Sequence, residues 1–351
     1  MTPECTITVR SPAELLAVTP YVLGFHPADS VVVIGMDGRS VAFGARYDLP
    51  PPQRDDSADI AAIVAAQPIQ LVTVIGYGPA DRVTPAVLRL ARALATLGVR
   101  IDDVLRVTDG RWWSYLCDNP SCCPDEGRPC HPPDSAIAAQ AVYRGQVALP
   151  DRQALVGQVA AVTGAARVAM AAATARARAR LTDLAGHDLR DRRSGRLVRR
   201  AGRVAVQDAE RRHRAGRTLT DDQVAWLGAL LVNGVVFDYA LDRSDHQEWR
   251  IRLWTDVVRR VEPAYVAAPA SLLGFAAWRA GQGALARVAV DRALKEAPGH
   301  RMAGMLDHLL CSGIGPQAVA ALSPPLGNGS ATRVRPAPAR RTRRDTHRRS
   351  L

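Results

Sequence analysis

Hydrophobic positions in the first 150 residues follow two different periods, which predicts strands interleaved with helices. Short β-rich apolar runs are typical of strands, and apolar residues three or four positions apart are typical of helices. The strand-like segments are 6–9, 30–36, 40–49, 69–78, 104–108 and 111–116. The helix-like segments are 13–25, 57–67 and 84–98. Because Asp-Gly turns separate two of the strand pairs, we expect hairpins within a mixed sheet that is layered with helices, an α/β fold.

Local signals predict where several of these helices begin and end. Ser11 and Pro12 suit the N-cap and the first turn of a helix, and Pro20 should interrupt that helix. Ser57 is expected to cap the second helix. Gly98 follows the third helix in the position where a left-handed residue ends many helices.

The pattern beyond residue 150 is helical throughout. Helices are expected to begin near Asp151 and at Thr220. A long alanine- and arginine-rich stretch runs over 159–217, with breaks expected around Gly186 and at Ser194-Gly195.

Residues 267–300 fit one 34-residue tetratricopeptide unit. Gly274, Ala286 and Ala293 fall where that repeat needs small residues so that two helices can approach closely. Residues 232–263 could form a degenerate preceding unit. The alternative is a generic helical hairpin, because a repeat array normally needs about three units.

These patterns divide the chain into four segments. They are an α/β domain over 1–150 that ends in a Cys/Pro-rich loop, an Ala/Arg-rich helical connector over 151–218, an all-α, tetratricopeptide-like domain over 219–315, and a disordered basic tail over 316–351.

The net charge of +12 is concentrated in two short segments. Residues 190–217 hold eleven arginines against three acidic residues, and 333–349 hold eight against one, so the rest of the chain is close to neutral. Arg196, Arg199, Arg200 and Arg203 are therefore candidate nucleic-acid contacts. A solvated helix paired with nearby acidic residues is the alternative, because no known DNA-binding motif accompanies them.

Four of the six cysteines fall in a proline-rich stretch that follows a tryptophan pair. The candidate metal ligands are Cys117, Cys122, Cys123, Cys130 and His131. Against a zinc site, the usual two-residue spacing is absent, and the side chains of the adjacent cysteines are expected to diverge. A reactive thiol and a stiff structural loop are the alternatives.

A second group of candidate residues should lie at one rim of the sheet. They are His26, Asp29, Arg46, Gly76, Gly78, Arg111, Trp112 and Tyr115. The segment "VIGYGPADR" resembles half of a dinucleotide fingerprint, with Asp81 in place of the third glycine. Ordinary turns also explain the glycines and the His26–Asp29 segment. Arg46, on a strand among apolar residues, needs Asp29, Asp48 or an anionic ligand as a partner.

Four segments together resemble the actinobacterial domain-of-unknown-function family 4192. They are "SPAELLAVTPYVLGFHPADSVVVIG", "VIGYGP", "LRVTDGRWWSYLCDNPSCCP" and "LLGFAAWRAGQGALARVAVDRAL". The resemblance covers about residues 5–315 and implies a soluble cytoplasmic protein, but no activity. The matching residues are His26, Pro27, Asp29, Gly76, Gly78, Arg111, Trp112, Tyr115, Cys117, Cys122 and Cys123. Cys130 and His131 lie outside the family pattern.

The sequence therefore predicts a cytoplasmic module that binds a small anionic ligand near the strand ends and a protein partner through its helical region. One alternative is a zinc- or thiol-dependent enzyme that uses the loop 117–131. Another is a nucleic-acid-associated protein that uses the arginine-rich segments. We expect no cofactor other than zinc. Without a signal peptide or an apolar run of about 18 residues, we expect no membrane contact.

Overall fold

A computed structural model describes residues 9–38, 40–51, 54–130, 136–143, 147–185 and 192–322. By its contacts the chain divides into Met1–Pro316 and Gln317–Leu351. Residues 323–351, which make up most of the predicted basic tail, lie outside the described residues. So do His131, the expected break at Gly186 and most of the strand expected over 6–9. The predicted start of disorder at residue 316 is wrong, because Pro316–Leu322 form a helix.

Six strands form one sheet in the order β2-β1-β3-β4-β5-β6. The strands are β1 (Ser30–Asp37), β2 (Ser40–Asp48), β3 (Leu71–Tyr77), β4 (Ile101–Thr108), β5 (Arg111–Ser114) and β6 (Arg128–Pro129). Only the β3–β4 pair is parallel among them. The predicted mixed sheet is therefore confirmed, together with both Asp-Gly hairpins.

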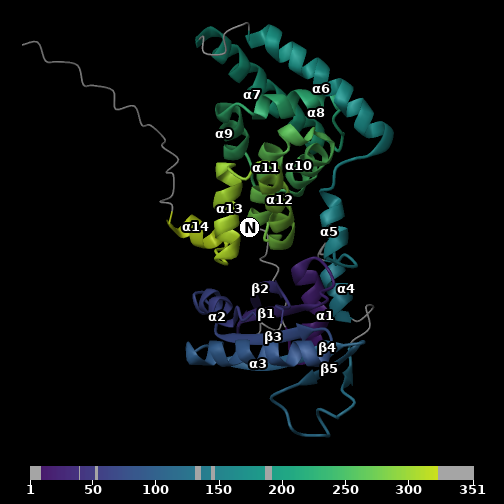
Figure 1. The fold of residues 1–351 in the computed structure, drawn as a ribbon, viewed down its shortest axis with the longest axis vertical. Helices are drawn as coiled ribbons and strands as arrows, with labels where there is room; N and C mark the ends of the chain where they lie inside the picture. Colours follow the sequence, from purple (N-terminus) through teal and green to yellow (C-terminus); the bar gives the residue numbers. More distant parts are fainter. Residues whose placement is uncertain are drawn as a thin grey trace, which may run out of the picture. The chain divides into compact units, whose positions relative to one another are not determined.

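Helices cover both faces of this sheet (Figure 1). Three helices belong to it: α1 (Pro12–Leu23), α2 (Ser57–Ala65) and α3 (Ala80–Thr96). The faces are set by the alternation of side chains along the strands. Val31 and Val33 of β1 pack with α2 and α3 in one apolar cluster, whereas the backbone of Gly44 in β2 lies against Val22 of α1. The result is the expected α/β layering.

The predicted helix ends were partly right. The Ser11 hydroxyl accepts a hydrogen bond from the Glu14 N–H at 3.2 Å, and Gly98 has φ +76° just after α3. Pro20, however, lies inside α1, where it is buried and does not end the helix, so the predicted interruption is wrong. Ser57 is the first residue of α2, and its N-cap is Asp56, whose side chain makes no capping bond.

The remaining described chain is helical apart from the turns, as expected. Its helices are α4 (Ala136–Tyr143), α5 (Arg152–Gln158), α6 (Gly164–Ala185), α7 (Arg192–Arg214), α8 (Asp221–Leu231), α9 (Gly234–Asp242), α10 (Glu248–Arg260), the 3₁₀ helix η1 (Pro263–Tyr265), α11 (Ala267–Arg279), α12 (Gly283–Glu296), α13 (Arg301–Cys311) and α14 (Pro316–Leu322). Asp151 and Thr220 cap α5 and α8 as predicted. The break expected at Ser194-Gly195 is wrong, because both residues lie within α7.

Helices α11 and α12 form a close-packed hairpin. A Cβ atom on Gly274 would lie 3.1 Å from Val290 Cγ2 and 3.5 Å from the Ala286 carbonyl oxygen, so only glycine allows this approach without movement. Ala286 and Ala293 are fully buried. The small residues thus act as the repeat pattern requires, although the tetratricopeptide assignment itself stays a prediction.

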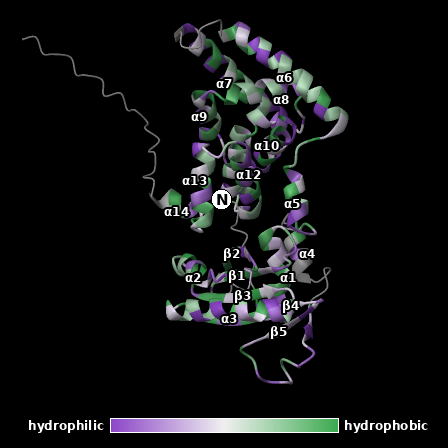
Figure 2. Cartoon of the chain, viewed as in Figure 1, coloured by the Kyte–Doolittle hydropathy of each residue, from purple (hydrophilic) through white to green (hydrophobic). Residues whose placement is uncertain are grey.

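Arginines stack on aromatic rings both in the sheet and in the helical part of the chain. The Arg106 guanidinium lies 3.8 Å from the centre of the Trp113 ring, and that of Arg180 lies 4.2 Å from the Trp226 ring. Hydrophobic and hydrophilic residues intermingle along α6, the helix that carries Arg180 (Figure 2). Stacking lets this helix pack with little continuous apolar surface of its own.

Within the described residues, no single helix has the length and apolar content to cross a membrane. Helices α8 and α9 satisfy the criterion only as a pair, and they are bent by 108° at the break between them.

Candidate functional site

The rim expected from the sequence is where β1 and β5 begin and β3 and β4 end. Ser30 pairs with Tyr77, Tyr77 with Val107, and Val107 with Trp112, so this row crosses four strands. The Thr108 hydroxyl donates to the Gly78 carbonyl at 2.6 Å. The loops that precede β1, follow β3 and connect β4 to β5 are therefore neighbours.

The two rim glycines have structural explanations. A Cβ atom on Gly76 would lie 2.1 Å from Val83 Cγ1, so this glycine lets α3 pack directly on β3. Gly78 has φ +137°, a conformation that other residues rarely adopt. Both observations match the tight strand-to-helix turn. Next to them, the exposed Asp29 has φ +43° and pairs with Arg82 at 3.2 Å.

The other rim candidates mostly hold neighbouring backbone in place. Arg111 donates from Nε to the Glu126 carbonyl at 2.6 Å and from Nη2 to the Gly127 carbonyl at 2.7 Å. The Tyr115 hydroxyl lies 2.6 Å from the Thr84 hydroxyl of α3. The side chain of His26 is exposed, and its backbone N–H donates to Leu149.

Three polar atoms of the rim row are buried without a hydrogen-bond partner. They are Ser30 Oγ, Tyr77 Oη and Trp112 Nε1. Burial raises the pKa of Tyr77, although the nearby Thr19 hydroxyl acts in the opposite direction. Sequence reasoning selected only Trp112 of the three. Ser30 and Tyr77 could have been found as polar residues at the ends of apolar strands.

The sulfur atoms of Cys117, Cys122 and Cys123 lie within 4.8 Å of one another. The expectation that the adjacent cysteines diverge is therefore wrong. The Asn119 carbonyl accepts hydrogen bonds from the N–H groups of both Cys122 and Cys123, at 2.9 and 2.7 Å, which turns the chain back towards Cys117. Cys130 is not part of this cluster.

The thiols of the cluster differ in acidity. The Asn119 N–H donates to the Cys117 sulfur and lowers the pKa of this thiol, and hydrogen bonds with Cys123 and Cys122 act in the same direction. Loss of hydration raises the pKa of Cys123 to about 11. Cys117 therefore ionises before Cys123.

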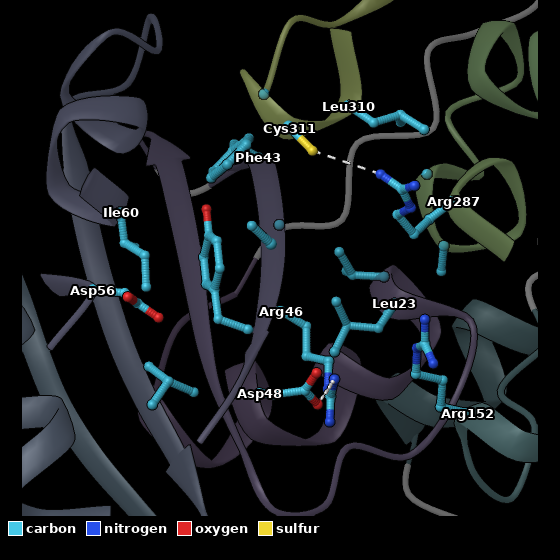
Figure 3. A pocket seen from close by; sticks show the side chains of 18 of the residues that line it. Leu23, Phe43, Arg46, Asp48, Asp56, Ile60, Arg152, Arg287, Leu310 and Cys311 are labelled. Carbon is cyan, nitrogen blue, oxygen red and sulfur yellow. Dashed lines mark hydrogen bonds and ion pairs between the residues drawn. The ribbon is translucent and has the colours of Figure 1, made fainter. Parts of the chain in front are cut away.

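A cavity of about 960 Å³ lies alongside β2 (Figure 3). Its walls come mainly from the end of α1, from β2, from α2 and the loop before it, from α5, and from α12, α13 and the turn that follows, with single contributions from β1 and α11 and two residues of α3. Leu23, Phe43, Ile60 and Leu310 supply apolar surface. Neither His26, Gly78 nor Trp112 lines this cavity, which is therefore separate from the rim.

Four arginines line the cavity, and each has an acidic partner. Arg46 pairs with Asp48 at 2.5 Å, and Arg54 with Asp56 at 2.7 Å. Arg152 reaches Asp291 at 3.4 Å, while Arg287 pairs with both Asp291 and Asp307. Of the partners proposed for Arg46 from the sequence, Asp48 is the one found, and the Ala28 carbonyl accepts a second bond at 3.3 Å.

Sequence reasoning selected only Arg46 among these arginines. The other three come from segments far apart in the chain, and no local motif marks them. The cavity also contacts Tyr47, whose pKa is raised to about 12, mainly by burial and further by Cys311.

The candidate nucleic-acid residues lie on α7. Arg196, Arg200 and Arg203 are exposed, with the spacing of one helical stripe, and Arg199 is half-buried. The Arg203 guanidinium lies 5.5 Å from the centre of the Tyr239 ring. Nucleic-acid binding through this stripe stays a prediction.

A family model described as domain of unknown function (DUF4192) matches residues 12–317. The chain belongs to this family. The match includes the sheet, the cysteine cluster and every residue that lines the cavity. No curated protein and no solved structure matches the chain. DUF4192 membership itself specifies no activity, so a function has to be argued from the sites.

Proposed function

We propose that the protein binds a small anionic ligand in the arginine-lined cavity. The observation that carries this proposal is the convergence of Arg46, Arg152 and Arg287 on one cavity with apolar walls. Its volume of about 960 Å³ falls within the range of small-molecule sites. This moves the expected ligand site from the strand ends to the outer strand of the sheet.

The arginines retain donors for a ligand despite their acidic partners. A guanidinium has five N–H donors, and one carboxylate uses one or two of them. Arg46 Nε is buried without a partner, and Arg152 has one long ion pair, at 3.4 Å, in the described residues. Planar arginine side chains suit carboxylate and phosphate groups, whose oxygens can accept two parallel hydrogen bonds.

The apolar walls indicate the rest of the ligand. Phe43 and Ile60 extend the surface of the sheet core, and Leu23 and Leu310 face the cavity from α1 and α13. Inorganic phosphate would leave this surface in contact with water. An organic phosphate or a carboxylate with an apolar portion would cover it, so this is the class that fits best.

Calorimetric titration of the purified full chain with organic phosphates and aliphatic carboxylates tests this proposal. Arg152→Gln removes one cavity cation whose side chain is 44% exposed, so folding should survive. We expect this variant to bind the best ligand at least tenfold more weakly. Arg252→Gln is the matched control, because Arg252 is an exposed arginine of α10 that pairs with Glu248 away from the cavity. Its binding should equal that of the wild type.

Two results would contradict the proposal. The first is that no compound of the panel binds. The second is that the best ligand binds Arg152→Gln and the wild type equally.

A further inference from the structure

Three free thiols lie close together after strand β5, and none of them lines the cavity. Cys117 follows β5 closely, and Cys122 and Cys123 belong to the loop that connects β5 to β6. Their sulfur atoms lie within 4.8 Å of one another. In a tetrahedral zinc site with Zn–S bonds of about 2.3 Å, neighbouring sulfurs are roughly 3.8 Å apart. A contraction of at most about 1 Å would bring the three sulfurs to that spacing.

The loop that carries these thiols is fixed by its own contacts. Trp113 donates from Nε1 to the Asp125 carbonyl at 3.0 Å, and Arg111 holds the next two carbonyls. Gly127 has φ +72°, and a Cβ atom there would lie 2.4 Å from the Trp113 ring. Arg128 reaches the Ser121 carbonyl at 3.3 Å. The cysteine backbone is therefore held in place without a metal, which lowers the entropic cost of binding one.

Backbone hydrogen bonds fix the turn that carries two of the three cysteines. The Asn119 carbonyl accepts hydrogen bonds from the N–H groups of Cys122 and Cys123. The positions of these two residues near Cys117 are therefore set by the backbone of the loop.

We propose that Cys117, Cys122 and Cys123 bind one Zn²⁺ ion through three thiolates. The fourth coordination position is open to solvent, because Cys122 is exposed. Thiolate ligands favour zinc over magnesium or calcium, which prefer oxygen. Cys130 and the cavity take no part, so this site is independent of the proposed ligand-binding function. The bound ion cross-links the β5–β6 loop.

Titration of the reduced, metal-free full chain with Co²⁺, followed by displacement with Zn²⁺, tests the site. We expect one equivalent of Co²⁺ to produce a thiolate-to-metal charge-transfer band that Zn²⁺ abolishes. Cys117→Ser should lose this band. Cys130→Ser and Cys311→Ser are the matched controls, because both residues are free cysteines outside the cluster, and they should keep the band unchanged.

Thermal unfolding provides a second measurement. Zn²⁺ should raise the midpoint of the wild type and of both controls, but not that of Cys117→Ser. If Cys117→Ser does not fold, Cys122→Ser replaces it, because the exposed Cys122 side chain contributes little to packing.

The proposal would be overturned if the wild type gave no charge-transfer band. It would equally be overturned if the Cys117→Ser/Cys122→Ser/Cys123→Ser variant bound Co²⁺ as the wild type does.

Discussion

Glu210 of α7 and Arg250 of α10 form an ion pair in which each side chain is only 5% exposed. Arg243 reaches the other carboxylate oxygen of Glu210, and Asp245 accepts from Arg250 at 2.9 Å. This network joins two helices that are separated by α8 and α9 in the sequence.

Replacing Glu210 with alanine should strongly destabilise the protein. The change leaves the Arg250 guanidinium buried without its main partner, which typically costs about 3–5 kcal/mol. The free energy of unfolding in urea measures this loss. Glu248→Ala breaks the exposed Arg252–Glu248 pair and should cost no more than about 1 kcal/mol. Equal losses of unfolding free energy in the two variants would contradict the prediction that the buried Glu210–Arg250 pair contributes more than the exposed one.

Gly76→Ala tests whether this glycine is a spacer between strand and helix. The new methyl group would lie 2.1 Å from Val83 Cγ1 and 2.8 Å from Val87 Cγ1, so α3 would have to move. We expect a loss of about 1–3 kcal/mol in the free energy of unfolding.

The matched control for Gly76 is Gly157→Ala in α5. Nothing lies within 4 Å of a Cβ atom there, and alanine favours the helix, so stability should be unchanged or rise by up to about 1 kcal/mol. Val83→Ala should partly restore the stability of Gly76→Ala. A Gly76→Ala variant as stable as the wild type would contradict the packing explanation.

The raised pKa of Tyr47 leads us to expect that the protein loses stability at alkaline pH. The unfolded chain releases this proton near pH 10.0, whereas burial holds it in the folded protein to about pH 12. The stabilisation is therefore complete below pH 10 and is lost as the pH rises towards 12. The shift corresponds to about 2–3 kcal/mol.

Comparison with Tyr47→Phe isolates this contribution, because Tyr77 and the other ionisable groups remain in both proteins. The unfolding free energy of the wild type should fall relative to that of the variant between pH 10 and 12. Parallel curves over that interval would contradict the prediction.

Most of the fold followed from local signals in the sequence. Apolar runs marked the central strands, and turn residues such as Gly110 marked the hairpins. Errors arose where context outweighed a local rule. Pro20 stays within α1, where its side chain is buried in the fold, and Gly195 stays within α7 because a single glycine weakens a helix without ending it.

The candidate sites were harder to predict from the sequence than the fold. The strand-to-helix turn at Gly78, which the sequence offered as the alternative to a dinucleotide-binding loop, is present because β3 and α3 are adjacent in the chain. The cavity joins Arg46 to Arg287, which are too far apart for any local pattern to connect. The cysteine cluster depends on the turn at Asn119, and residue spacing alone could not reveal that turn.

The chain has a single lysine, Lys295, among its 46 basic residues. A GC-rich coding bias would explain that imbalance without any benefit to the protein. Yet the stacked guanidiniums of Arg106 and Arg180 use a flat shape that an ammonium group does not have. Replacing the arginines with lysines would therefore keep the net charge but lose the planar stacking of Arg106 on Trp113 and of Arg180 on Trp226.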